Sequence, residues 1–211
     1  MSAKRKEMVD RQLVARGIRD PEVLRAMAEV PRDAFVPRHL RHMAYTDSPL
    51  PIGEEQTISQ PYIVALMTEA MEVSGDDRVL EIGTGSGYAA AVLSRIAAEV
   101  YTVERHGSLA RSARQKFEEL GYDNVHVRHG DGTMGWAEYA PYDAIVVTAG
   151  GPQVPEPLLE QLATGGCLVI PVGPSQYSQE LVRIRRTSEA DYHRENLGAV
   201  RFVPLVGSEG W

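Results

Sequence analysis

The stretch Val79-Leu80-Glu81-Ile82-Gly83-Thr84-Gly85-Ser86-Gly87 joins a short apolar run to a glycine-rich turn. An apolar run that ends at glycine is typical of a buried β-strand, and the pattern from about Tyr88 predicts a helix. Glycine has no Cβ, so such a turn lets backbone amides approach a ligand closely. The stretch therefore predicts a strand, a ligand-binding turn and a helix. A turn that merely packs tightly is the alternative at this point.

Short apolar runs alternate with helical patterns after this stretch. Strands are expected at residues 78–82, 100–104, 125–129, 143–148 and 167–172, with helices from about residue 88, through 109–120 and around 158–162. This βαβ pattern and the Val, Ile and Leu content predict five parallel strands covered on both faces. Residues 181–186 and 199–206 predict a terminal, partly antiparallel pair. The expected fold is a doubly wound, mostly parallel α/β sheet.

Helices are also expected before the sheet. An amphipathic helix over residues 4–16 ends at Gly17, and a second begins at Asp20-Pro21 and ends at Pro31. Residues 37–61 are expected to be irregular, and a third helix begins at Pro61 and ends at Gly75. The chain is predicted to be one domain over 1–211, with helices and a substrate loop in 1–75, a cofactor-binding core in 76–175 and C-terminal strands in 176–211.

Composition limits the classes of partner. The 211 residues carry a formal charge of −7, which gives no general attraction for phosphate backbones or anionic membranes. The single cysteine, Cys167, lies in an apolar run and is compatible with a reducing compartment. No segment is long and apolar enough to span a membrane. We expect a cytoplasmic monomer that binds neither nucleic acid nor membranes.

Acidic residues follow the glycine turn at successive strand ends. The spacing Gly-x-Gly-x-Gly differs from the Gly-x-Gly-x-x-Gly of dinucleotide enzymes and favours a nucleoside without phosphates. Glu104, about 20 residues after the turn, can accept hydrogen bonds from ribose hydroxyls. Glu81 adds negative charge, which favours a cationic sulfonium. Asp131 can accept from an adenine amino group, while the backbone at Gly132 lines the ring.

A hydroxyl-rich segment precedes the core. Residues 53–65 combine Thr57 and Ser59 with the helix start at Pro61, which is a suitable site for a carboxylate. The alternative is that Ser59 only caps that helix.

Several stretches resemble the protein-L-isoaspartate O-methyltransferase family over nearly the whole chain. The most specific are Thr57-Ile58-Ser59-Gln60-Pro61 before the glycine turn and Val203-Pro204-Leu205 near the end. Four more carry the resemblance: the stretch from Val79 to Tyr88, Gly130-Asp131-Gly132, Val147-Thr148-Ala149-Gly150-Gly151-Pro152-Gln153-Val154-Pro155 and Leu168-Val169-Ile170-Pro171-Val172-Gly173. The family usually has three alanines where this chain has Ala149-Gly150-Gly151, a departure that removes no functional group.

The resemblance implies a class I, Rossmann-like methyltransferase with N-terminal helices. It implies methyl transfer from S-adenosylmethionine to the free α-carboxylate of L-isoaspartyl residues in damaged proteins and peptides, after which the ester collapses to a succinimide. By similarity Ser59 is the active-site serine, and Thr57, Ser59, Val203 and Leu205 contact the substrate. The cofactor residues implied are Thr57, Ile58, Ser59, Glu81, Gly83, Thr84, Gly85, Ser86, Gly87, Glu104, Arg105, Asp131, Gly132 and Thr148.

Other interpretations are weaker. His126 and His129 are three apart on a predicted strand and face opposite sides, so no metal site is expected there or elsewhere. A methyltransferase for a small molecule or RNA would share the cofactor turn but not the segment from Thr57 to Pro61. A non-enzymatic nucleotide-binding protein would bind the cofactor without methyl transfer.

Overall fold

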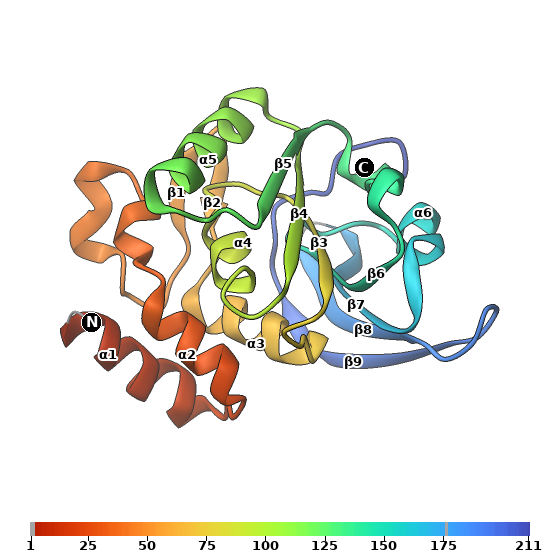
Figure 1. Cartoon of the computed structure of the whole chain (residues 1–211), viewed down its shortest axis with the longest axis horizontal. Helices are drawn as coiled ribbons and strands as arrows, with labels where there is room; N and C mark the ends of the chain where they lie inside the picture. The colour runs from red at the N-terminus through yellow and green to blue at the C-terminus, as the bar shows by residue number, and fades with distance from the viewer. Residues whose placement is uncertain (1–2, 176) are drawn as a thin grey trace.

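A seven-stranded sheet of order β5-β4-β3-β6-β7-β8-β9 forms the centre of the fold (Figure 1). The computed structural model describes residues 3–175 and 177–211. Residues 1–2, at the start of the predicted unit 1–75, and residue 176, at the start of the predicted unit 176–211, lie outside the described residues. Strands β5, β4, β3, β6 and β7 run parallel, as predicted, and β8 and β9 are antiparallel. The strands are β3 (Arg78–Ile82), β4 (Glu99–Glu104), β5 (Val125–His129), β6 (Tyr142–Val147), β7 (Leu162–Ser175), β8 (Ser178–Arg186) and β9 (Tyr192–Val200).

Two apolar clusters cover the two faces of the sheet. Val79 on β3 packs into a cluster with the helices α3 (Pro61–Met71), α4 (Tyr88–Leu93) and α5 (Gly107–Leu120). Leu80 and Ile82 point the other way, into a cluster that includes Leu158 of α6 (Glu156–Glu160). Side chains alternate between faces along a strand, so Glu81 lies on the same face as Val79, beneath the helices. The expected covering of both faces is confirmed.

The N-terminal helices form largely where expected. The first begins as α1 (Ala3–Met8), continues through a π-helical turn at Val9–Leu13 and a 3₁₀ turn at Val14–Arg16, and stops at Gly17, which has φ 99°. Helix α2 (Pro21–Glu29) begins with Asp20, whose carboxylate accepts hydrogen bonds from the amides of Glu22 and Val23. No helix in the described part of the chain is long and apolar enough to cross a bilayer.

The segment over residues 37–61 is more regular than expected. It holds a 3₁₀ turn at Arg38–Met43 and an antiparallel hairpin of β1 (Leu50–Gly53) and β2 (Gln56–Ile58), and another 3₁₀ turn, at Arg32–Phe35, precedes it. Gly53, Glu54 and Glu55 all have positive φ, which makes the tight turn. Two of these are glutamates, so the sequence carried little turn signal. Helix α3 begins at Pro61 as predicted but ends at Met71, before Gly75.

The predicted final strand was placed wrongly. The expected strand over residues 199–206 overlaps β9 only at its first two positions, because β9 runs from Tyr192 to Val200. Six of the nine residues of β9 are exposed, since it is the edge of the sheet, so it lacks an alternating apolar pattern. Beyond it, Pro204 makes only an isolated bridge to Gly150.

Candidate active site

The turn after β3 is anchored on both sides by neighbouring strands. The amide of Gly83 donates to the carbonyl oxygen of Val103 at 2.8 Å, and Thr148 Oγ1 donates to the carbonyl oxygen of Gly83 at 2.8 Å. Gly83 has φ 98°, and a Cβ there would lie 2.4 Å from Thr148 Oγ1. Only glycine fits, so the backbone follows the strand ends closely.

Gly85 and Gly87 have different surroundings. Gly85 has φ 53° and lines the cavity above the turn. Gly87 has φ 89°, is buried, and a Cβ there would lie 2.7 Å from Cζ of Phe117 on α5. Gly87 therefore permits close packing of two helices and does not line the cavity.

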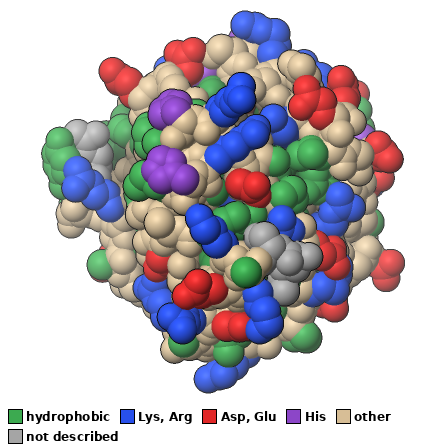
Figure 2. Space-filling model, turned by 90° about the vertical axis from the view of Figure 1, so that its left-hand side faces the viewer, with side chains coloured by type: hydrophobic (Ala, Val, Ile, Leu, Met, Phe, Trp, Pro, Cys, Tyr) green, Lys and Arg blue, Asp and Glu red, His purple; other side chains and the backbone are tan. Residues whose placement is uncertain are grey.

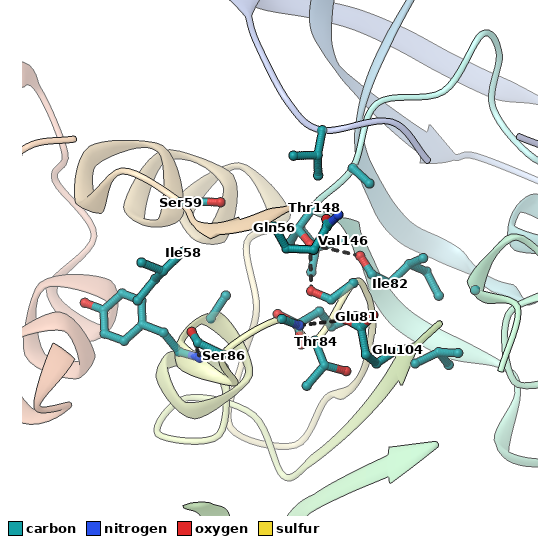
Figure 3. A pocket seen from close by; sticks show the side chains of 18 of the residues that line it. Gln56, Ile58, Ser59, Glu81, Ile82, Thr84, Ser86, Glu104, Val146 and Thr148 are labelled. Atoms are coloured by element: carbon teal, nitrogen blue, oxygen red, sulfur yellow. Dashed lines mark hydrogen bonds between the residues drawn. The ribbon is translucent and has the colours of Figure 1, made fainter. Parts of the chain in front are cut away.

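Glu104 at the end of β4 is the main acidic group beside the turn. Its Oε2 accepts from the amide of Gly85 and its Oε1 accepts from the amide of His106, each at 2.8 Å. The side chain is buried but lines the cavity, and lone pairs remain for a ligand (Figure 3). This carboxylate both fixes the turn and can accept hydroxyl donors.

Glu81 lies deeper, on the helix-covered face of the sheet. Thr102 Oγ1 donates to Glu81 Oε2 at 2.6 Å, and Thr84 and Thr102 share a hydrogen bond of 2.6 Å. Burial raises the pKa of Glu81 to about 8; nearby Glu104 adds to the increase, and the Thr102 hydroxyl and the Ala90 amide oppose it. Thr102 was not predicted from sequence, because it is one of several β-branched residues in an apolar strand.

The predicted Asp131 and Gly132 are placed differently from each other. Gly132 lines the cavity, and a Cβ there would lie 2.4 Å from Cγ2 of Ile82. The carboxylate of Asp131 accepts from the amide and hydroxyl of Thr133 and from the amide of Ser208 in the C-terminal tail. Asp131 lies outside the cavity lining. Its contact with the tail was not visible in the sequence, because the partners are distant in the chain.

The hairpin of β1 and β2 brings the hydroxyl-rich segment to the same cavity. Thr57 and Ile58 end β2, and Ser59 follows. The residue that caps α3 is Gln60, whose own side chain makes no cap hydrogen bond. The first-turn amide of Tyr62 donates instead to Asp47 Oδ1 at 3.3 Å, so Ser59 is not the helix cap. Ser59 and Gln56 both line the cavity (Figure 3). A hydrogen-bond donor is thus available where the hairpin meets the turn.

The cavity brings together most of the predicted residues. Of the predicted set, those that line it are Thr57, Ile58, Ser59, Glu81, Gly83, Thr84, Gly85, Ser86, Glu104, Arg105, Gly132, Thr148, Val203 and Leu205. Sequence reasoning missed Gln56 and His106, as well as Met67, Thr68 and Met71 of α3. His106 follows Glu104 by two positions, which was the available signal; the α3 residues face the sheet through their helical spacing.

A second, wider groove adjoins this cavity. The two share Gln56, Thr57, Ser59, Thr148, Val203 and Pro204. The groove extends to Arg16, Tyr62, Arg201 and Phe202, whereas Leu205 lines only the first cavity and is buried. A ligand in the cavity and one in the groove would therefore meet beside Ser59.

No metal cluster accompanies this site in the described residues. No three His, Cys, Asp or Glu side chains there gather as metal ligands would. His126 instead contacts Glu99 at 2.7 Å, and His129 contacts the carbonyl oxygen of Arg105 at 3.1 Å.

Sequence comparison identifies close relatives. The model of the family described as Protein-L-isoaspartate(D-aspartate) O-methyltransferase (PCMT) matches residues 3–210. The chain is 66% identical over 208 residues to Protein-L-isoaspartate O-methyltransferase 2 of Pelobacter propionicus, covering 99% of this chain and 92% of the relative. It is 64% identical over 211 residues to Protein-L-isoaspartate O-methyltransferase 1 of Geotalea uraniireducens, covering 100% and 96%.

Solved structures of similar proteins share the fold of this chain. One protein-L-isoaspartate O-methyltransferase superposes with a TM-score of 0.88 at 32% identity, covering 98% of this chain and 67% of that one. A Plasmodium falciparum structure described as a beta-aspartate methyltransferase (PCMT) in complex with S-adenosyl-L-homocysteine gives 0.84 at 26% identity, covering 97% and 99%. The predicted Rossmann-like methyltransferase fold is confirmed. This chain belongs to the protein-L-isoaspartate(D-aspartate) O-methyltransferase family.

Proposed function

We propose that this chain transfers the methyl group of S-adenosylmethionine to the free α-carboxylate of L-isoaspartyl residues in damaged proteins and peptides. The methyl ester then forms a succinimide away from the enzyme. The observation that carries the proposal is the meeting of the cavity and the groove at Thr57 and Ser59. A cofactor above the glycine turn and an acceptor in the groove would share this boundary.

The residues of the cavity fit the cofactor. Gly83 and Gly85 of the glycine turn line the cavity, and Glu104 presents acceptor lone pairs suited to ribose hydroxyls. Oε1 of Glu81 is buried without a hydrogen-bond partner among the described residues. When bound, S-adenosylmethionine supplies a methyl group activated by a sulfonium. Arg105, Thr148, Ile58 and Gly132 complete the proposed cofactor site.

The acceptor needs orientation and not a strong base. A free main-chain carboxyl has a pKa near ~3.5, so it is ionised at neutral pH. We assign Ser59 as a hydrogen-bond donor that holds the carboxylate in line with the methyl group, with Thr57 and Val203 beside it. Alignment and exclusion of water carry the rate in such a reaction. Leu205 supports this wall from the cofactor side.

Paired peptides test the proposal. Two peptides of identical composition, one with an isoaspartyl linkage and one with normal aspartyl, are incubated with the enzyme and methyl-labelled S-adenosylmethionine. We expect label only in the isoaspartyl peptide, as an alkali-labile ester. Equal labelling, or labelling of a nucleoside or small molecule instead, would contradict the proposed acceptor.

We propose a cytoplasmic monomer that contacts neither nucleic acid nor membranes, with one domain over residues 1–211. Acidic and basic side chains are interspersed across the face shown in Figure 2, which is a poor match for a phosphate backbone. Cys167 is a free, buried thiol, as suits a reducing compartment.

A further inference from the structure

Glu81 is a carboxyl group in an apolar setting. Its side chain is 0% exposed and lies on the sheet face covered by α3 and α4. In register with it are Thr102 on β4 and Val146 on β6. A carboxylate removed from water in this way is costly unless a cation or several donors compensate.

The hydrogen bonds of Glu81 are incomplete. Thr102 gives its only hydroxyl hydrogen to Oε2, so the hydroxyl of Thr84 must donate to Thr102 in turn. Oε1 is buried and has no hydrogen-bond partner among the described residues. Because Thr102 holds Oε2, Oε1 is the oxygen left to interact with a ligand in the cavity that Glu81 lines.

No cation compensates the group in the described structure. The titratable groups that share its cavity are Glu104, Arg105, His106 and Tyr88. The charged neighbour that acts on Glu81 is Glu104, which also disfavours ionisation, and the Thr102 hydroxyl and Ala90 amide only partly offset burial. The neutral acid is therefore the favoured form at neutral pH when no ligand is bound.

We propose that Glu81 is an uncharged acid in the empty enzyme, that it releases its proton to solvent when cationic S-adenosylmethionine enters the cavity, and that Thr102 is the positioning residue that holds its carboxyl group in both states. The O–H bond of the carboxyl group breaks, its electron pair stays on oxygen, and the buffer takes the proton. The inference rests on the proposed cofactor and adds a linkage between its binding and pH.

Calorimetry of cofactor binding tests whether Glu81 releases a proton. S-adenosylmethionine is titrated into the intact protein at pH 7.0 in two buffers of different ionisation enthalpy, and the difference in observed heat counts the protons released. We expect close to one more proton per cofactor for wild type than for Glu81→Gln, a neutral variant of matched shape. The subtraction removes titration of the ligand's own amino group. His193→Asn, which removes an exposed titratable group on β9 outside the cavity lining, should keep the wild-type release.

The positioning role has its own readout. Without the Thr102 hydroxyl the ionised form of Glu81 loses its donor, so Thr102→Val should move the pH midpoint of cofactor affinity upward by about one unit, and Thr102→Ser should restore it. Thermal unfolding of each variant checks that it folds. Equal proton release in wild type and Glu81→Gln, or an unmoved midpoint in Thr102→Val, overturns the inference. Failure of wild type to bind the cofactor at all would instead overturn the proposed function.

Discussion

The amide of Gly85 donates a 2.8 Å hydrogen bond to Oε2 of Glu104, so the end of β4 fixes the turn that follows β3. The other carboxylate oxygen holds the amide of His106, at the start of α5. One buried side chain thus sets the position of two backbone segments around the cavity. It does so while keeping lone pairs for a ligand.

Glu104→Gln should weaken cofactor binding. The new amide NH₂ would face one of the two backbone donors, and the charge-assisted hydrogen bonds would be lost. A loss of about 2 kcal/mol corresponds to a Kd about 30-fold higher, measurable by calorimetry. Glu99→Gln, on the same strand but at the exposed contact with His126, is the matched control and should bind normally. A Kd within about threefold of wild type for Glu104→Gln would contradict this role.

Glu54 at the hairpin turn should slow cofactor release. Its Oε1 accepts from Ser108 Oγ at 2.5 Å, and Ile52 of the same hairpin lies next to Gly85. The hairpin is therefore held to α5 by Glu54 and lies against the glycine turn through Ile52. Glu54→Ala should raise the cofactor dissociation rate about 3- to 10-fold in stopped-flow measurements, since one hydrogen bond contributes about 0.5–1.5 kcal/mol. Glu118→Ala on α5 is the control, and identical dissociation rates for both variants would argue against the tie.

Ser59→Ala should reduce turnover more than cofactor affinity. The hydroxyl borders both the cavity and the groove, and its proposed partner is the charged acceptor. Loss of a donor to a charged group costs about 1.5–3 kcal/mol, or about 10- to 150-fold in kcat/KM for the isoaspartyl peptide. The Kd for the cofactor should stay within about twofold. Ser188→Ala, in the turn after β8, is the control, and equal losses in turnover and cofactor affinity would exclude the role.

Local patterns were sufficient to predict the parallel core and most of the cavity. The strand ends at Ile82 and Glu104 are marked by apolar runs that stop at glycine or charge, and parallel strands place such ends at one edge of the sheet. The chemistry of the turn follows from its glycines. These signals lie within a few residues of each other, so no distant contact is needed to interpret them.

The features that the sequence did not reveal depend on distant contacts. Strand β9 is held by pairing with β8, and its polar edge carries no apolar alternation. The isolation of Glu81 from water depends on α3 and α4, which lie on either side of it in the chain. The bond from Ser208 to Asp131 joins residues 77 positions apart. Spacing alone could not place any of these.

The stability of the cofactor-free protein should fall as pH rises through neutrality. Burial raises the pKa of Glu81 from 4.5 to about 8, so between these values the folded state binds a proton that the unfolded chain has lost. The stabilising contribution is complete below about pH 4.5 and is lost as pH rises to about 8. Its slope is up to about 1.4 kcal/mol per pH unit.

Urea unfolding of wild type and Glu81→Gln at pH 5.5 and pH 7.5 measures this slope. The free energy of unfolding of the variant, relative to wild type, should increase by about 1–3 kcal/mol between the two pH values. Glu118→Gln, at an exposed position on α5, serves as control and should follow wild type. Parallel pH dependence of wild type and Glu81→Gln would contradict a neutral Glu81 in the folded, empty enzyme.

The C-terminal tail is tied to Asp131. Burial alone would raise the pKa of this carboxyl group, but the amides of Ser208 and Thr133 and the Thr133 hydroxyl lower it below its usual value overall. A Cβ at Gly207 would lie 2.1 Å from Asp131 Oδ1, so the tail approaches closely only with glycine there. Trp211 completes the attachment with a 2.9 Å bond from Nε1 to the carbonyl oxygen of Gly150.

This attachment allows the predicted adenine contact of Asp131 to be separated from its structural role. Gly207→Ala displaces the tail but leaves the Asp131 carboxylate in place. Asp131→Asn removes the carboxylate and also weakens its hold on the tail. If the carboxylate also accepts from the adenine amino group, Asp131→Asn should raise the cofactor Kd about tenfold and Gly207→Ala by about threefold or less. Limited proteolysis should show the tail released in both variants, which confirms that they are matched. Equal increases in Kd would mean that Asp131 acts on the cofactor only by holding the tail against the cavity wall at Leu205 and Val206.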